Sequence, residues 1–173
     1  MLLLQFTGLS GAGKTTISLG VEQRLTEMGY SVEIIDGDEY RRHLSHDLGF
    51  SKADRIENIR RLGLVGMVLV RHKIIVILAA INPYESARQA LSAQSTAVRT
   101  IHIDCSLEVL QERDVKGLYR RALLPAHDPD HVAHFTGISD PYEPPANPDL
   151  LIRTDLEPVE ISVAKVVEFV VSV

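Results

Sequence analysis

The sequence predicts an α/β fold in which helices cover a mainly parallel β-sheet. Short apolar runs alternate along the chain with segments of helical period, which is the pattern of such folds. The first apolar run ends at a glycine-rich turn that leads directly into a helical segment. A later run, KIIVILAAI at residues 73–81, is apolar at successive positions, as expected for a central parallel strand that is buried on both faces.

The first two predicted strands flank a long helix. The first strand is expected over Leu2–Thr7 and the helix over Lys14–Met28, with Gly29 as its C-terminal cap. Apolar residues recur on one face of this helix, namely Ile17, Val21, Leu25 and Met28. The second strand is expected over Ser31–Asp36, and a short polar helix follows over Glu39–His46.

The rest of the chain is expected to form a long helix, a third strand and then two pairs of a strand and a helix. These elements cover Lys52–His72, Lys73–Ile81, Thr100–Cys105, Leu107–Arg113, Asp149–Thr154 and Glu157–Phe169. Residues 114–148 contain most of the prolines and no long apolar period. This stretch is therefore predicted to be either a functional lid or a disordered segment.

The composition is that of one globular domain of 173 residues, and it argues against several classes of protein. The formal net charge is -5, which argues against a protein that binds a nucleic-acid polymer. No apolar run reaches the roughly 20 residues of a membrane-spanning helix, and the N-terminal run lacks the basic flank of a signal peptide. Cys105 is the single cysteine, so no internal disulfide is expected and a reducing, cytoplasmic location is predicted.

A phosphate-binding loop is predicted after the first strand. Residues 8–15, GLSGAGKT, match the pattern G-x-x-x-x-G-K-[ST] and lie between a predicted strand and a predicted helix. Glycines let successive backbone N–H groups turn toward phosphate oxygens, and the following helix points its positive end at the same anion. Lys14 would reach the β- and γ-phosphates of ATP, and the Thr15 hydroxyl would bind Mg²⁺. The predicted ATP-binding residues are Gly8, Leu9, Ser10, Gly11, Ala12, Gly13, Lys14, Thr15 and Thr16.

Two acidic residues, Asp36 and Asp38, end the second predicted strand. The chain has no Asn-Lys-x-Asp guanine reader, and the strand at 73–81 ends without the acid that many phosphate-loop ATPases place there. Ligands of open α/β sheets bind outside the carboxyl ends of the strands, where this acid pair would lie. One carboxylate would orient a Mg²⁺-bound water, and the other would accept a proton from an attacking hydroxyl. A turn that only caps the next helix is the alternative.

The acceptor is predicted to be an anion that carries a base. A group of guanidinium and amide side chains follows the acid pair, namely Arg41, Arg42, Arg55, Asn58, Arg60 and Arg61. Arginine clusters suit anionic ligands, although a solvated helix face with ion pairs to Asp54 and Glu57 would use the same residues. Phe50 and Phe135 lie in loop-like sequence, where they could stack on a base or serve ordinary loop packing.

Five segments form a series that is more specific than the phosphate loop alone. They are GLSGAGKTT at 8–16, DGDEYR at 36–41, DLGFSKADRIENIRR at 47–61, RDVKGLYRRA at 113–122 and FTGISDPYEPPANP at 135–148. In this order they strongly resemble the adenylyl-sulfate kinase (APS kinase) family, and the resemblance spans about residues 3–155.

The resemblance implies a P-loop kinase fold, a three-layer sandwich with a five-stranded parallel sheet, in one domain over residues 1–173 with a lid at about 114–148. It implies that MgATP phosphorylates the 3′-hydroxyl of adenylyl sulfate (APS) to 3′-phosphoadenylyl sulfate in sulfate assimilation. It also implies a homodimer.

By motif, the resemblance assigns catalysis to Asp38, Asp36 and Lys14, with Asp38 nearest the acceptor hydroxyl. The metal would lie at Thr15 and Asp36. The substrate-binding residues would be Arg41, Phe50, Arg55, Asn58, Lys116, Gly117, Leu118 and Phe135. Phe50 and Phe135 would sandwich the adenine, and the segment at 116–118 would begin the lid.

Two departures from the family pattern bear on the mechanism. Residues 81–84 read Ile-Asn-Pro-Tyr where the family commonly has Ile-Ser-Pro-Tyr, so Asn82 offers no hydroxyl for a phosphoenzyme and direct transfer is expected. The lid sequence RRALLPAHDPDHVAHFTG is longer than usual, which leaves a different small nucleotide as an alternative acceptor. A nucleotide-binding module without turnover is a third interpretation, against which the intact acid pair argues.

Overall fold

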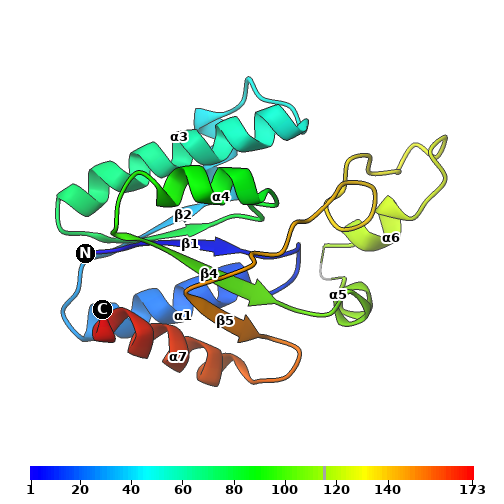
Figure 1. The fold of residues 1–173 in the computed structure, drawn as a ribbon. Helices are drawn as coiled ribbons and strands as arrows, with labels where there is room; N and C mark the ends of the chain where they lie inside the picture. The colour runs from blue at the N-terminus through cyan, green and yellow to red at the C-terminus, as the bar shows by residue number, and fades with distance from the viewer. Residues whose placement is uncertain (115) are drawn as a thin grey trace.

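Within residues 1–114 and 116–173, which the computed structural model describes, five strands form one parallel sheet (Figure 1). The strands are β1 (Leu3–Thr7), β2 (Val32–Asp36), β3 (Ile75–Ala79), β4 (Val98–Asp104) and β5 (Leu150–Arg153). Their spatial order is β2-β3-β1-β4-β5, and every neighbouring pair is parallel. β1 and β3 are buried along their whole length, as expected for central strands. The predicted parallel α/β sheet is confirmed.

Helices cover both faces of the sheet and complete three layers (Figure 1). The helices of these layers are α1 (Lys14–Glu27), α3 (Lys52–Arg71), α4 (Glu85–Ser92) and α7 (Val159–Ser172). Leu4 belongs to the apolar cluster with α1 and α7, whereas its neighbour Leu3 belongs to the cluster with α3 and α4. This alternation follows from the two-residue period of a strand, and it explains why both faces of β1 are apolar.

Three shorter helices lie nearer the carboxyl ends of the strands. α2 (Gly37–Leu44) follows β2 directly, and α5 (Leu107–Arg113) and α6 (Leu118–Ala122) lie beyond the carboxyl end of β4 (Figure 1). Apart from α6, the described part of the predicted lid consists of turns, bends and irregular backbone with one isolated bridge. Residue 115, which falls within the predicted lid, lies outside the described residues.

Two helices, α4 and α6, lie outside the elements expected from the sequence. α4 begins just after Pro83, and it turns Ala87 and Leu91 onto the core with a spacing of four residues. That signal is present in the sequence, but it covers only two turns. α6 depends on Gly117, which has a φ of 63° at the N-cap, and not on any apolar period. None of the helices in the described part of the chain is long and apolar enough to cross a membrane.

Candidate active site

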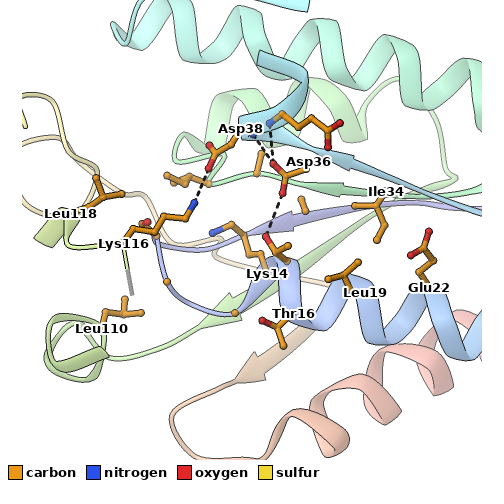
Figure 2. A pocket seen from close by; sticks show the side chains of 18 of the residues that line it. Lys14, Thr16, Leu19, Glu22, Ile34, Asp36, Asp38, Leu110, Lys116 and Leu118 are labelled. Carbon is orange, nitrogen blue, oxygen red and sulfur yellow. Dashed lines mark hydrogen bonds and ion pairs between the residues drawn. The ribbon is translucent and has the colours of Figure 1, made fainter. Parts of the chain in front are cut away.

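A cavity of about 720 Å³ lies at the carboxyl edge of the sheet, between the loop after β1 and the end of β2 (Figure 2). Its lining includes Lys14 and Thr15 from the start of α1, Asp36 and Asp38 from the β2–α2 junction, and Lys116 from the segment before α6. Parallel strands bring their carboxyl ends to one edge of a sheet. The structure therefore brings the predicted phosphate loop and the predicted acid pair together around one space.

Glycines shape the phosphate loop for two different reasons. Gly11 and Gly13 have φ angles of 78° and 99°, in the left-handed region that side chains disfavour. Gly8 approaches β4 so closely that an added Cβ would lie 2.2 Å from the carbonyl oxygen of Ile103. This backbone leads into the N-terminus of α1, where the partial positive charge favours a phosphate.

Lys14 lies folded back along the phosphate loop. Its Nζ donates hydrogen bonds to the carbonyl oxygens of Gly8 at 2.9 Å and Leu9 at 2.8 Å. Burial lowers the pKa of Lys14 to about 8, and the nearby carboxylates of Asp38 and Asp36 oppose this shift. A bound triphosphate would stabilise the charged ammonium that burial disfavours.

Asp36 serves two purposes at the end of β2. Its Oδ1 accepts hydrogen bonds from the backbone N–H groups of Asp38 at 2.9 Å and Glu39 at 3.1 Å, so it caps α2. The helix-capping interpretation is therefore confirmed for Asp36. Its Oδ2 accepts a hydrogen bond from the Thr15 hydroxyl at 3.4 Å (Figure 2). A hydroxyl and a carboxylate oxygen are hard donors of the kind that Mg²⁺ prefers, so the two residues fit the predicted metal.

Asp38 reaches further into the open cavity than Asp36 does. Its side chain is 81% exposed, and its Oδ2 lies 3.1 Å from Lys116 Nζ (Figure 2). Lys116, at the start of the predicted lid, thus forms an ion pair with Asp38, the predicted catalytic carboxylate. Gly117 caps α6, and Leu118 also lines the cavity, so the three predicted lid residues lie at its border.

Phe50 lies beside two guanidinium groups. The Cζ atoms of Arg41 and Arg55 lie 4.4 Å and 5.5 Å from its ring centroid, and the ring is 57% exposed. Arg41 also donates hydrogen bonds to the carbonyl oxygens of Leu48, at 3.3 Å, and Gly49. An exposed ring beside two cations is a candidate for stacking with the base of an anionic ligand.

Arg55 connects the loop before α3 with the distant segment at 134–140. It donates from Nε to the carbonyl oxygen of Phe50 at 3.0 Å and from Nη2 to that of His134 at 2.7 Å. It also forms an ion pair with Asp140 at 3.2 Å. Since both charged side chains are largely buried, this contact joins the two segments that carry Phe50 and Phe135.

Asn58 is 6% exposed, and its Oδ1 accepts no hydrogen bond from the described residues. The hydroxyl of Thr136, which is 2% exposed, likewise has no partner within the described part of the chain. A buried polar atom without a partner costs free energy, so each atom suits a hydrogen-bonding group of a ligand. Sequence reasoning predicted Asn58 and missed Thr136, although Thr136 follows the predicted Phe135.

Arg60 and Arg61 form ion pairs on a helix face, which was the alternative to anion binding by the arginine cluster. Both donate to Glu57, and Arg61 also forms a two-pronged pair with Asp47 at 2.6 Å and 2.8 Å. These guanidinium groups lower the pKa values of Glu57 and Asp47 to about 2. The predicted ion pair with Glu57 is thus confirmed for these two arginines, which were not among the predicted site residues.

Phe135 lies in the core and not on the surface. It is 7% exposed and meets the ring of Tyr119 edge-on, with the centroids 4.9 Å apart and an interplanar angle of 89°. Tyr119 in turn donates a hydrogen bond from its hydroxyl to the carbonyl oxygen of Ser10 at 2.8 Å. The predicted sandwich of an adenine between Phe135 and Phe50 stays a prediction.

Two further side chains, which were not predicted from the sequence, support the site through hydrogen bonds to its backbone. The Thr154 hydroxyl donates to the carbonyl oxygen of Ala12 at 2.9 Å and so supports the phosphate loop. The Asp114 carboxylate accepts from the N–H groups of Tyr119 at 2.9 Å and Arg120 at 3.0 Å, so it caps α6. The contact of Thr154 spans most of the chain, and no local pattern indicates it.

Asn82 is buried behind the site at the end of β3. Its φ is 43°, in the left-handed region, which asparagine tolerates better than most residues. Its Nδ2 donates to Gln5 Oε1 at 3.2 Å, and its carbonyl oxygen accepts from the Thr7 hydroxyl at 3.0 Å. Asn82 therefore has a structural role in the loop that leads away from β3.

Comparisons with known proteins agree with this geometry. A family model described as adenylylsulphate kinase matches residues 1–153. An adenylyl-sulfate kinase of Synechococcus sp. (strain JA-3-3Ab) is 52% identical over 149 residues, covering 86% of this chain and 82% of that protein. One from Halothermothrix orenii is 50% identical over 164 residues, covering 95% of this chain and 86% of that protein.

A solved structure resembles the chain over almost its whole length. It is the Mycobacterium tuberculosis APS kinase in complex with AMPPNP and APS, with a TM-score of 0.89 and 36% identity. The match covers 98% of this chain and 96% of that one. With its phosphate loop, its acid pair and these relatives, the chain belongs to the adenylyl-sulfate kinase family.

Proposed function

We propose that this protein is an adenylyl-sulfate kinase, which transfers the γ-phosphoryl group of ATP to the 3′-hydroxyl of APS. The observation that carries the proposal is the position of Asp38, whose exposed carboxylate lies in the same cavity as Lys14 and Thr15. A kinase for a sugar hydroxyl needs a proton acceptor opposite its phosphate loop, whereas a module that only binds a nucleotide does not.

The chain's own residues account for the transfer as a direct displacement. Lys14 and the amides of the phosphate loop hold the β- and γ-phosphates in place. Asp38 accepts the proton of the 3′-hydroxyl as the new O–P bond forms, while the bond from the γ-phosphorus to the β–γ bridging oxygen breaks and ADP leaves. Thr15 and Asp36 would hold Mg²⁺, which supplies neutralisation of the phosphate charge when it is bound with ATP. Direct transfer suits Asn82, which has no hydroxyl to carry a phosphoryl group.

The acceptor binds next to the cavity, toward Arg41, Arg55 and the segment at 134–140, none of which belongs to the cavity lining itself. Arg41, Arg55 and Asn58 hold the phosphosulfate and the ribose of APS, and Phe50 and Phe135 enclose the adenine. The partnerless Oδ1 of Asn58 supports this assignment, because a ligand group would satisfy it. Lys116, Gly117 and Leu118 begin a lid over about 114–148 that closes on the acceptor.

The proposal extends to the molecular context. We place the reaction in sulfate assimilation, in the cytoplasm, with residues 1–173 acting as one kinase domain and as a homodimer. A structural neighbour from Thiobacillus denitrificans is described as hexameric, with 31% identity and a TM-score of 0.71, so the family includes other assemblies. Light scattering coupled to size-exclusion chromatography distinguishes a dimer from a hexamer.

The test is a coupled assay of ADP release with APS, measured against a blank without acceptor. The same assay with a panel of other small nucleotides tests whether the altered lid sequence accompanies a different acceptor. Turnover with APS that exceeds the blank and every other acceptor supports the proposal. No turnover with APS above the blank rejects it, and a better alternative acceptor changes the substrate but keeps the kinase.

A further inference from the structure

We infer that Tyr119 is a positioning residue that couples the phosphate loop to the aromatic part of the acceptor site. This inference rests on the proposed function. Tyr119 lies in α6, is 2% exposed, and donates its hydroxyl to the carbonyl oxygen of Ser10 at 2.8 Å. Its ring packs against that of Phe135 in a T-shaped arrangement. One rigid side chain thus contacts the loop for ATP and the ring proposed to stack on APS.

The bond to Ser10 bears directly on phosphate binding. The carbonyl group of Ser10 and the N–H group of Gly11 belong to one planar peptide unit and point in opposite directions. A donor that holds this carbonyl oxygen therefore fixes the direction of the Gly11 N–H, one of the amides of the predicted phosphate cradle. Gly11 has a φ of 78° and no side chain that would limit rotation of this unit, so an external anchor matters here.

A second contact joins the same two regions. Gly137 lies two residues after Phe135 and packs against Leu9 of the phosphate loop, so closely that an added Cβ would lie 2.8 Å from Leu9 Cδ2. Its φ of 93° requires glycine as well. The segment at 135–137 therefore rests on the phosphate loop through Leu9 and on Tyr119 through Phe135.

Tyr119 is itself held firmly, which a coupling element requires. The Asp114 carboxylate accepts a hydrogen bond from its backbone N–H at 2.9 Å, and this caps the helix that carries it. Burial raises the pKa of Tyr119 to about 12, so its hydroxyl remains a hydrogen-bond donor throughout the neutral range. A nucleotide that orders the phosphate loop thereby also orders Phe135 and raises the affinity for the acceptor, and by linkage the acceptor raises the affinity for the nucleotide by the same factor.

Isothermal titration calorimetry of APS binding, with and without saturating AMPPNP, measures the coupling. AMPPNP occupies the ATP site without donating a phosphoryl group. The coupling factor is the Kd for APS without AMPPNP divided by the Kd with saturating AMPPNP. We expect a factor of at least about fivefold in the parent protein. In Tyr119→Phe, which keeps the ring and loses the hydroxyl, we expect this factor to fall at least about threefold, toward one.

Tyr142→Phe is the matched control. It removes a half-buried tyrosine hydroxyl that bonds to Thr7 at 3.0 Å, before the first residue of the phosphate loop and not to the Ser10 carbonyl, and it should keep the parent coupling factor. A second measurement tests the hydrogen bond from Tyr119 to Ser10 directly. In NMR spectra of the free protein, the chemical shift of the Gly11 amide should change in Tyr119→Phe and stay the same in Tyr142→Phe. This measurement separates a changed loop from a general loss of stability.

The outcomes distinguish the two proposals. If the parent protein phosphorylates APS, but its coupling factor is unchanged in Tyr119→Phe or is absent altogether, this inference fails and the proposed function stands. An unmoved Gly11 resonance in Tyr119→Phe also overturns it. If the parent protein binds AMPPNP but neither binds nor phosphorylates APS, the proposed function fails and the inference fails with it.

Discussion

Lys116 Nζ lies 3.1 Å from Asp38 Oδ2, so the first cation of the predicted lid is paired with the carboxylate that we propose as the catalytic base. Both side chains are mostly exposed, and such a pair exchanges partners readily. We expect the phosphate groups of the two anionic substrates to compete for Lys116 and to leave Asp38 free to accept a proton. The pair therefore orients the carboxylate in the free protein without holding it tightly.

Asp38→Asn should abolish most of the activity and spare ATP binding. An amide cannot accept the proton of the 3′-hydroxyl, so turnover should fall by about 10² or more, whereas the Kd for ATP should stay close to the parent value. Steady-state assays and titration with AMPPNP measure the two quantities. Asp130→Asn makes the same chemical change at an exposed lid position and should keep its activity. Turnover of Asp38→Asn near the parent value would show that the base is another group.

Phe50→Ala should weaken binding of the acceptor and not of ATP. The ring is 57% exposed beside Arg41 and Arg55, and its stacking on a base is worth about 1–3 kcal/mol. Calorimetry with APS and with AMPPNP separates the two sites. Phe50→Leu is the matched control, since it keeps apolar bulk without a stacking face and should lie between Ala and the parent. An unchanged Kd for APS in Phe50→Ala would mean that Phe50 only packs.

ATP binding should take up a proton at alkaline pH because of Lys14. The pKa of Lys14 is lowered to about 8 in the free protein, and bound phosphates favour the charged ammonium and raise it. Above about pH 8 the free protein has lost this proton and the complex regains it, so the affinity for ATP falls as the pH rises through this range. At pH 7 most of the protein carries the proton in both states, so this group contributes little uptake.

Calorimetry with AMPPNP in two buffers of different ionisation enthalpy detects the proton uptake. The apparent enthalpy should depend on the buffer at pH 9 in the parent protein. Lys14→Arg keeps a positive charge that does not titrate in this range, so the buffer dependence attributed to Lys14 should disappear. An enthalpy at pH 9 that is equal in both buffers for the parent protein would contradict the assignment.

Arg88→Met should destabilise the fold. The Arg88 side chain is 2% exposed, pairs with Glu85, and donates to the carbonyl oxygens of Asn82, at 2.6 Å, and Glu143. Its removal leaves buried acceptors without a donor, and the free energy of unfolding should fall by about 2–4 kcal/mol. Urea unfolding measures this loss. Arg99→Met, at a more exposed ion pair with Asp149, should cost less than about 1 kcal/mol, and equal losses in both variants would contradict the argument.

Much of the candidate site could be predicted because its signals are contiguous. The phosphate loop is encoded in eight successive residues between an apolar run and a helical period, and Asp36 and Asp38 follow another apolar run directly. Asp36 also shows the limit of such reasoning. Metal binding and helix capping look like alternatives in the sequence, whereas its two oxygens in fact face Thr15 and the N-terminus of α2 separately.

By itself, the sequence determined the alternation of strands and helices, the phosphate loop and the acid pair, since each depends on neighbouring residues and on backbone preferences. Only the tertiary structure decided the strand order β2-β3-β1-β4-β5 and the partners of distant side chains. Arg55 meets His134 across 79 positions, and Tyr119 meets Ser10 across 109. Such contacts arise where segments that are far apart in the sequence meet at the carboxyl edge of the sheet, and no periodicity within either segment carries that information.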